Sequence, residues 1–282
     1  MRFTSVSVRG SRIITCLAAL VFAGAALAQP QRVVSMNLCT DQLAMMLAAP
    51  GQLHSVTFLA RDPGYSAMPE EAMAYEVNHR LAEEIYLQQP DLVISGSFSG
   101  HATVDMIRRL GIEVEVFDPA RSLEDVRANI LRMGELLGRQ DAAEAMVARY
   151  DAGLAALQVS ADENGPRAAI YALRGWTQGE RSLAGQILRA AGFRNIAAEL
   201  GYDWGGVLPL ERLAMIDPDV VITARPSPGH GRAKETMDHP VIDYLRARAG
   251  QAVMSDRDWV CGTPHVLGAI ERLAAIRGQV AR

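Results

Sequence analysis

The chain lacks the positive-charge pattern and the short motifs that mark several large classes of protein. Lys234 is its only lysine, its formal net charge is −4, and no basic stripe with interleaved aromatic residues is present. Nucleic-acid binding, which needs such a positive surface, is therefore disfavoured. Glycine-rich phosphate loops, the Gly-x-Ser-x-Gly nucleophile motif and the His-Glu-x-x-His zinc motif are also missing, so no common enzyme class is indicated.

Long apolar runs are lacking too, except for one at the N-terminus. Three arginines precede an apolar run at residues 13–26, and a small-x-small cleavage site follows at residues 26–28. This order is typical of a secretory signal peptide, and the run is short for a membrane span. We predict that residues 1–28 are removed and that the mature protein is exported, to the periplasm if the source is a Gram-negative bacterium.

Cysteine is scarce. Once the signal peptide and its Cys16 are removed, Cys39 and Cys261 remain, one in each half of the chain. In an oxidising compartment they either form a disulfide that ties the halves together or stay as free thiols. No His-x-x-x-His or Cys-x-x-Cys spacing occurs, so a metal site built from protein ligands is poorly supported, its ligands are unknown and no cofactor is predicted.

What the chain does contain is an alternation of short apolar segments with amphipathic ones, which is typical of an α/β fold. Residues 61–80 are polar and are predicted to be mostly loop. Strands are predicted at residues 32–37, 54–60, 91–95, 114–117 and 168–173, and helices at 40–49, 81–88, 103–110, 122–137, 141–160 and 182–191.

Part of this pattern occurs twice. Residues 81–95 (LAEEIYLQQPDLVIS) return as residues 209–223 (PLERLAMIDPDVVIT), and residues 105–118 return in the same order as residues 243–256. Each match alone is weak, because any helix followed by Pro-Asp and a strand would look similar. Together they indicate two copies of one α/β unit.

Between the two copies lies a long amphipathic segment. It starts with Asp141 and Glu144, which have the spacing of a capping box, and apolar residues then recur at helical intervals to about residue 160. We interpret it as a rigid helix joining two lobes. The predicted organisation is a signal peptide at 1–28, an N-terminal α/β lobe at 29–138, a linking helix at 139–163 and a C-terminal α/β lobe at 164–282.

The loops after the strands are where a ligand is expected, because open parallel sheets bind ligands beyond the carboxyl ends of their strands. All three tryptophans fall in such loops of the second copy. Indole rings there could form the wall of a large flat ligand, and arginines could meet its carboxylates, although core packing and solvated surface remain alternatives. The predicted ligand-binding residues are Tyr65, His79, Arg80, Phe98, Arg174, Trp176, Trp204, Arg225, Asp258 and Trp259. A metal centre within the ligand could also take a loop histidine, from among His79, His101, His230 and His265.

At this point the residues resemble a known family. The segment RVVSMNLCTDQL at residues 32–43, the repeated helix–strand pair and the mid-chain helix look like the periplasmic substrate-binding proteins of ABC importers for vitamin B12, ferric siderophores and haem. The resemblance covers about residues 32–275. It implies two Rossmann-like lobes joined by a single long α-helix, a ligand cleft between the lobes, a monomer, and no enzymatic activity.

The resemblance also implies roles for individual residues. Glu83 and Glu211, at matching positions of the repeat, would dock onto arginines of the permease membrane subunits; alternatively, each merely favours the start of its helix. Trp204 and the Asp258-Trp259 pair match cleft residues of the vitamin B12-binding members, whereas the three residues that follow Trp259 depart from them.

The predicted function is capture of a metal chelate, cobalamin or another corrinoid first and a ferric siderophore or haem next, and its delivery to the permease. Two other functions stay open. An exported metal chaperone or α/β enzyme would act through Cys39, Cys261 and the histidines, and would show protein-bound metal or turnover. A signalling sensor that presents its ligand to a receptor would share the same fold.

Overall fold

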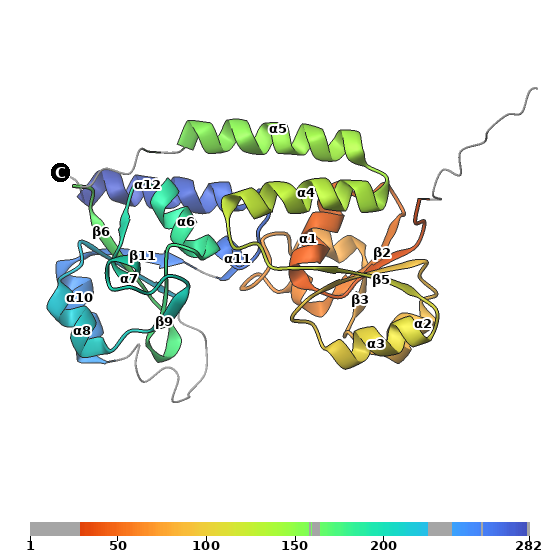
Figure 1. The fold of residues 1–282 in the computed structure, drawn as a ribbon, viewed down its shortest axis with the longest axis horizontal. Helices are drawn as coiled ribbons and strands as arrows, with labels where there is room; N and C mark the ends of the chain where they lie inside the picture. The colour runs from red at the N-terminus through yellow and green to blue at the C-terminus, as the bar shows by residue number, and fades with distance from the viewer. Residues whose placement is uncertain (1–28, 158, 160–163, 225–238, 255, 281–282) are drawn as a thin grey trace, which may run out of the picture.

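Two α/β halves make up the molecule (Figure 1). The computed structural model describes residues 29–157, 159, 164–224, 239–254 and 256–280. The first half is built on a five-stranded parallel sheet, and the second on a four-stranded parallel sheet with a separate two-stranded antiparallel ribbon. The predicted α/β class with two lobes is confirmed.

The sheet of the first half has the strand order β3-β2-β1-β4-β5. Its inner strand β4, between β1 and β5, is buried along its whole length, as its mainly apolar sequence predicts for a strand covered on both faces. The edge strand β3 was not predicted, because it lies in the polar segment at residues 61–80, whose composition is typical of a loop. The elements are β1 (Val33–Ser35), α1 (Leu38–Leu47), β2 (Leu53–Thr57), the 3₁₀ turns η1 (Phe58–Arg61) and η2 (Glu71–Ala74), β3 (Glu76–Asn78), α2 (Ala82–Leu87), β4 (Leu92–Gly96), α3 (His101–Arg109) and β5 (Glu113–Phe117).

The sheet of the second half has the strand order β11-β10-β6-β8. The ribbon β7–β9 was missed because its Gly-Gly segment is typical of a loop. The elements are β6 (Arg167–Tyr171), η3 (Leu173–Gly175), β7 (Trp176–Gln178), α6 (Leu183–Ala190), β8 (Arg194–Asn195), α7 (Ile196–Glu199), β9 (Gly205–Val207), α8 (Leu210–Ile216), β10 (Val220–Ala224), α10 (Pro240–Arg248), β11 (Gly250–Met254), α11 (Asp256–Trp259) and α12 (Val266–Val280).

The duplication inferred from the sequence is present in the strand order. β2-β1-β4-β5 of the first half corresponds to β8-β6-β10-β11 of the second, and the repeated segments are α2–β4 and α8–β10. The aspartate after the shared proline has a structural role in both halves. The carboxylate of Asp91 accepts the backbone N–H of Arg32 at 2.9 Å, and that of Asp219 accepts the backbone N–H of Arg167 at 2.7 Å. Each carboxylate thereby fixes a helix-to-strand loop to the start of the first strand of its sheet.

Two long helices, α4 (Leu123–Leu137) and α5 (Gln140–Leu157), follow the first sheet. The capping box lies on α4, where Ser122 and Asp125 bond reciprocally to each other's backbone N–H. The capping box predicted from Asp141 was wrong, because α5 already begins at Gln140. Asp141 therefore lies within the first turn, where its charge still favours the helix N-terminus.

Helix α5 spans both halves, with α4 and α12 beneath it (Figure 1). Glycines allow close contact on each side. A methyl group on Gly134 of α4 would overlap Ala143 of α5, and one on Gly153 of α5 would overlap Leu267 of α12. One continuous cluster of buried apolar residues contains members of both sheets and all three helices. The two halves are therefore joined by a shared core as well as by the chain.

A disulfide also joins the halves. It links Cys39, in the first turn of α1, to Cys261, between α11 and α12, with the two Cα atoms 5.0 Å apart. Of the two alternatives left open by the sequence, the structure shows the bridge. Within the described ranges, no helix is both long enough and apolar enough to cross a membrane.

Candidate functional site

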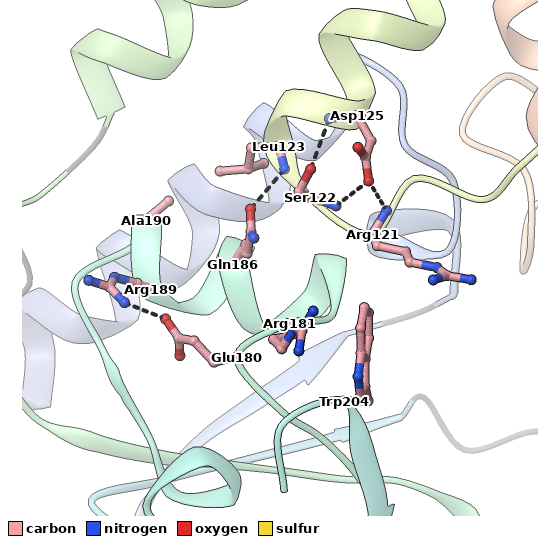
Figure 2. Close-up of a pocket in the computed structure, with 10 residues that line it drawn as sticks. All are labelled: Arg121, Ser122, Leu123, Asp125, Glu180, Arg181, Gln186, Arg189, Ala190 and Trp204. Atoms are coloured by element: carbon pink, nitrogen blue, oxygen red, sulfur yellow. Dashed lines mark hydrogen bonds and ion pairs between the residues drawn. The ribbon is translucent and has the colours of Figure 1, made fainter.

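A cavity of about 600 Å³ lies where the two halves meet (Figure 2). The first half contributes the turn that opens α4, and the second contributes the turn that opens α6, the body of α6 and the loop before β9. This volume is within the range of small-molecule binding sites. The lining residues are Arg121, Ser122, Leu123, Asp125, Glu180, Arg181, Gln186, Arg189, Ala190 and Trp204.

The same tripeptide, Arg-Ser-Leu, opens the helix on each side of the cavity, at residues 121–123 and 181–183. Ser122 accepts the backbone N–H of Asp125 at 2.9 Å, and Ser182 accepts that of Gly185 at 3.0 Å. Each serine is thus an N-cap, and each arginine stands just before a helix N-terminus. Two helix N-termini with their positive dipole ends make this part of the cleft suitable for an anionic group.

Both arginines stack on Trp204. The guanidinium carbon of Arg181 lies 4.4 Å from the centre of the indole ring, and that of Arg121 lies 5.3 Å from it. Figure 2 shows the ring edge-on, with Arg181 on one side and Arg121 on the other. The indole is 46% exposed, so part of it remains available to a ligand. Guanidinium groups stack well on aromatic faces while keeping their N–H donors at the edge free for carboxylates.

Backbone contacts hold this arrangement in place. The N–H of Arg181 donates to the carbonyl of Asp203 at 2.8 Å, and the N–H of Gly179 donates to the carbonyl of Trp204 at 3.1 Å. Residue 179 has to be glycine, because a Cβ there would overlap the carbonyl of Tyr202.

The two halves are also connected directly across the cavity. The backbone N–H of Leu123 on α4 donates a hydrogen bond to the side-chain oxygen of Gln186 on α6, at 2.9 Å. It fixes the two helix openings relative to each other. The spacing of the two arginines is therefore set by the fold rather than by flexible side chains alone.

The charge in the cavity is positive overall. Glu180 pairs with Arg189 at 2.7 Å, and the Asp125 carboxylate accepts backbone N–H groups, including that of Arg121 at 2.8 Å. The guanidinium groups of Arg121 and Arg181 have no ion pair with any carboxylate in the described ranges. Two lining cations that form no ion pair of their own favour a ligand that brings carboxylates to them.

Of the predicted ligand-binding residues that the structure describes, Trp204 alone lines this cavity. In the first half, Phe98 is 82% exposed in a turn and Tyr65 is half-exposed in a loop. His79 stacks on Phe58 with ring centres 5.8 Å apart, and the guanidinium of Arg80 lies 5.6 Å from the same ring. These four side chains form no common site with Trp204.

In the second half, Arg174 lies in the η3 turn with a positive φ of 60° and Trp176 is half-exposed on β7. The carboxylate of Asp258 is paired with Arg272, and Trp259 packs against the main core, which is the alternative that the sequence left open for it. Arg225 and His230 lie outside the described residues. Within the described ranges, no group of three or more His, Cys, Asp or Glu side chains is placed to hold a metal ion.

Sequence reasoning missed Arg121 and Arg181, although both lie in loops that were predicted to face the cleft. The signal that could have found them is the tripeptide Arg-Ser-Leu, which occurs twice, each time between a strand and a helix. A serine after a loop is a helix-start signal, so the arginine before it is placed at a helix N-terminus.

Glu83 and Glu211 lie in the first turns of α2 and α8, at matching positions of the repeat. Both side chains are exposed, and neither forms an ion pair with a residue that the structure describes. They are thus two free surface charges, one on each half.

Comparison with known proteins identifies the group to which this architecture belongs. The family model for periplasmic binding proteins matches residues 33–252. The chain belongs to the periplasmic binding protein family. This binding protein is 27% identical over 199 residues to the cobalamin-binding protein of Halobacterium salinarum, in a match that covers 69% of this chain and 54% of that one. The chain therefore spans about half the length of the curated relative.

Solved structures of periplasmic binding proteins have the same fold. The heme-binding protein RhuT from Roseiflexus sp. RS-1 has a TM-score of 0.73 at 22% identity, with 89% of this chain and 99% of that one covered. The heme-binding protein HutB of Vibrio cholerae has a TM-score of 0.72 at 18% identity, covering 87% and 98%. The vitamin B12-binding protein BtuF of Vibrio cholerae has a TM-score of 0.66 at 15% identity, covering 90% and 99%.

Proposed function

We propose that this binding protein is the substrate-binding component of an ABC importer, which captures a metal chelate between its halves and delivers it to the permease. The observation that carries the ligand class is the stack of Arg121, Trp204 and Arg181 in the cavity. The family assignment supports the transport role. We further propose a monomer that acts in the periplasm after loss of residues 1–28, with a linking segment at 139–163, which contains α5, between lobes at 29–138 and 164–282.

The chemistry of the cavity narrows the ligand. A flat ring flanked by two unpaired guanidinium groups matches a chelate whose macrocycle or aromatic arms carry carboxylates. Haem, with its two propionates, and anionic ferric siderophores have this character. Cobalamin is the second candidate, supported by the cobalamin-binding relative; its ring carries mainly neutral amides, which gain less from two cations.

Delivery to the permease needs a surface outside the cleft. Glu83 and Glu211 supply a matching charge on each half, on helices that lie away from the cavity. Exposed charge pairs add little affinity, but they steer two proteins together and fix their orientation. We propose that these carboxylates meet arginines of the two permease subunits.

The test of the ligand class begins with the protein as its host makes it. The absorbance spectrum and mass of whatever co-purifies distinguish corrin, haem and ferric siderophore. The ligand-free protein is then titrated with hemin, cyanocobalamin and a ferric carboxylate siderophore, and quenching of tryptophan fluorescence reports binding. We expect the carboxylate-bearing chelates to bind more tightly than cyanocobalamin.

Replacing both arginines, Arg121→Ala with Arg181→Ala, should weaken binding of the preferred chelate about 100-fold, because each lost charged hydrogen bond costs about 1.5 kcal/mol or more. The matched control is Arg132→Ala. That arginine also stacks on an aromatic ring, with its guanidinium 4.3 Å from Phe117, but it does not line the cavity. Unchanged affinity in the double variant would show that the chelate does not bind in this cavity.

A further inference from the structure

Each of the two docking glutamates is accompanied by a strongly exposed apolar side chain. Leu87 lies one turn after Glu83 on α2, and Met215 lies one turn after Glu211 on α8. Both are 79% exposed. Side chains four residues apart on a helix share one face, so each half presents a carboxylate and an apolar group side by side.

The pairing is the same in both halves although the helices have diverged. Between the charge and the apolar residue, Ile85 and Leu213 match and are fully buried, as core packing requires. The next pair differs in chemistry: Tyr86 of α2 is an aromatic residue that corresponds to an alanine in α8. Folding explains why the buried position is apolar in both halves, but not why both halves expose a large apolar group two positions after it, at Leu87 and Met215.

A single exposed leucine or methionine needs no explanation on its own. Two at equivalent positions of a duplicated surface, each beside an unpaired carboxylate, indicate a partner that offers the same complementary surface twice. Figure 1 shows α2 and α8 in opposite halves, both on the side away from α5. Contact with a second copy of this chain would need only one of the two surfaces, so it would not explain why the other has the same pair of residues. A partner with two-fold symmetry would bind both surfaces in the same way.

We propose that Leu87 and Met215 are apolar anchors that dock into two equivalent sockets on the permease dimer, each socket lying next to the cation that receives Glu83 or Glu211. This inference rests on the proposed importer function. The carboxylates steer the approach, since exposed ion pairs contribute little net affinity, and burial of the two apolar side chains supplies the binding. The complex therefore keeps part of its affinity at high salt, where the ion pairs are screened.

The experiment measures binding of the intact mature protein to the purified permease–ATPase complex of the importer in lipid nanodiscs, with no chelate added. The variants are Leu87→Ser, Met215→Ser and the two combined, and thermal unfolding verifies that each is folded. We expect each single change to weaken binding about tenfold and the pair about 100-fold, in line with interface hot spots. In 0.5 M NaCl, the double variant should lose the residual binding that the wild type retains.

Two further variants make the outcome decisive. Tyr86→Ser removes another exposed apolar side chain of α2, 51% exposed, that has no apolar counterpart of its size in α8; it should leave binding unchanged. Reversing both charges, Glu83→Arg with Glu211→Arg, tests docking itself. Loss of binding on charge reversal with none in the Leu87/Met215 variant would overturn the anchors and leave the importer function standing. If neither variant loses binding, docking through these helices is overturned. If Tyr86→Ser weakens binding as much as Leu87→Ser does, the apolar contact is unspecific and the anchors are overturned.

Discussion

Asp41, on the first turns of α1, is an acid that the fold keeps out of water. It is fully buried; its Oδ2 accepts the backbone N–H and the hydroxyl of Thr57, at 3.1 and 2.6 Å, and its Oδ1 accepts no hydrogen bond from the residues described. Burial raises the pKa of this carboxyl to about 7, although Ser35, Thr57 and the charge of Arg80 oppose the rise. Folding therefore favours the protonated, uncharged acid.

This pKa makes stability depend on pH. The folded protein binds one more proton than the unfolded chain between about pH 4 and about pH 7, so the free energy of unfolding should fall as the pH rises through that range and level off above it. Asp41→Asn keeps an acceptor for Thr57 and removes the charge. We expect the variant to be more stable than the wild type at pH 8, by at most about 4 kcal/mol, and by less than half as much at pH 5, where most of the pH range of the loss still lies ahead. Urea unfolding at both pH values checks this, and equal pH dependence in the two proteins would contradict it.

Packing between α4 and α5 depends on a missing side chain. Gly134 of α4 faces Ala143 of α5 so closely that a Cβ on residue 134 would overlap it. Gly134→Ala should therefore lower the free energy of unfolding by about 1–3 kcal/mol, as overpacking of a core does. The matched control is Gly278→Ala in α12, which meets nothing within 4 Å and should raise stability by about 0.5–1 kcal/mol. Denaturant midpoints of the two variants should move in opposite directions; a gain in both would show that the helices can separate freely.

The sequence predicts most of the helices and strands, because helical periodicity and short apolar runs are local signals. The helix predicted at residues 122–137 is α4 with Ser122 as its cap, and the strand predicted at residues 91–95 is β4 shifted by one residue. The short strand β3 and the ribbon β7–β9 lie in polar or glycine-containing segments that lack this signal. Their pairing depends on neighbours that only the folded chain brings together.

The disulfide between Cys39 and Cys261 acts on the whole molecule. It closes a loop with a sequence separation of 222 residues, which restricts the unfolded chain strongly. Changing both residues to serine should lower the free energy of unfolding by about 3–5 kcal/mol. Thermal unfolding with and without reductant checks this: the wild type in reductant should match the double variant, and the variant itself should not respond. Equal stability of all samples would show that the shared core alone holds the halves.

The sequence predicts the two-lobed fold and the paired glutamates because the chain contains an internal repeat, in which residues 81–95 can be aligned with residues 209–223. It does not predict that Arg121 and Arg181 converge on Trp204, since the contact of Arg121 with Trp204 joins opposite halves and depends on the angle between them. Trp259 illustrates the same limit: its loop position favours the cleft, but the structure packs it against the core. Loop residues acquire their role from tertiary structure, which no local pattern encodes.

The long span of the disulfide also sets an order of events in biogenesis. Residue 39 is synthesised well before residue 261, so the thiol of Cys39 has to wait for its partner while the first half already has everything needed to form its own sheet. During that interval, any thiol in its surroundings competes for it. This bond can close only after residue 261 has been synthesised and brought close to Cys39, a proximity that the packing of the second half against the first supplies in the folded molecule.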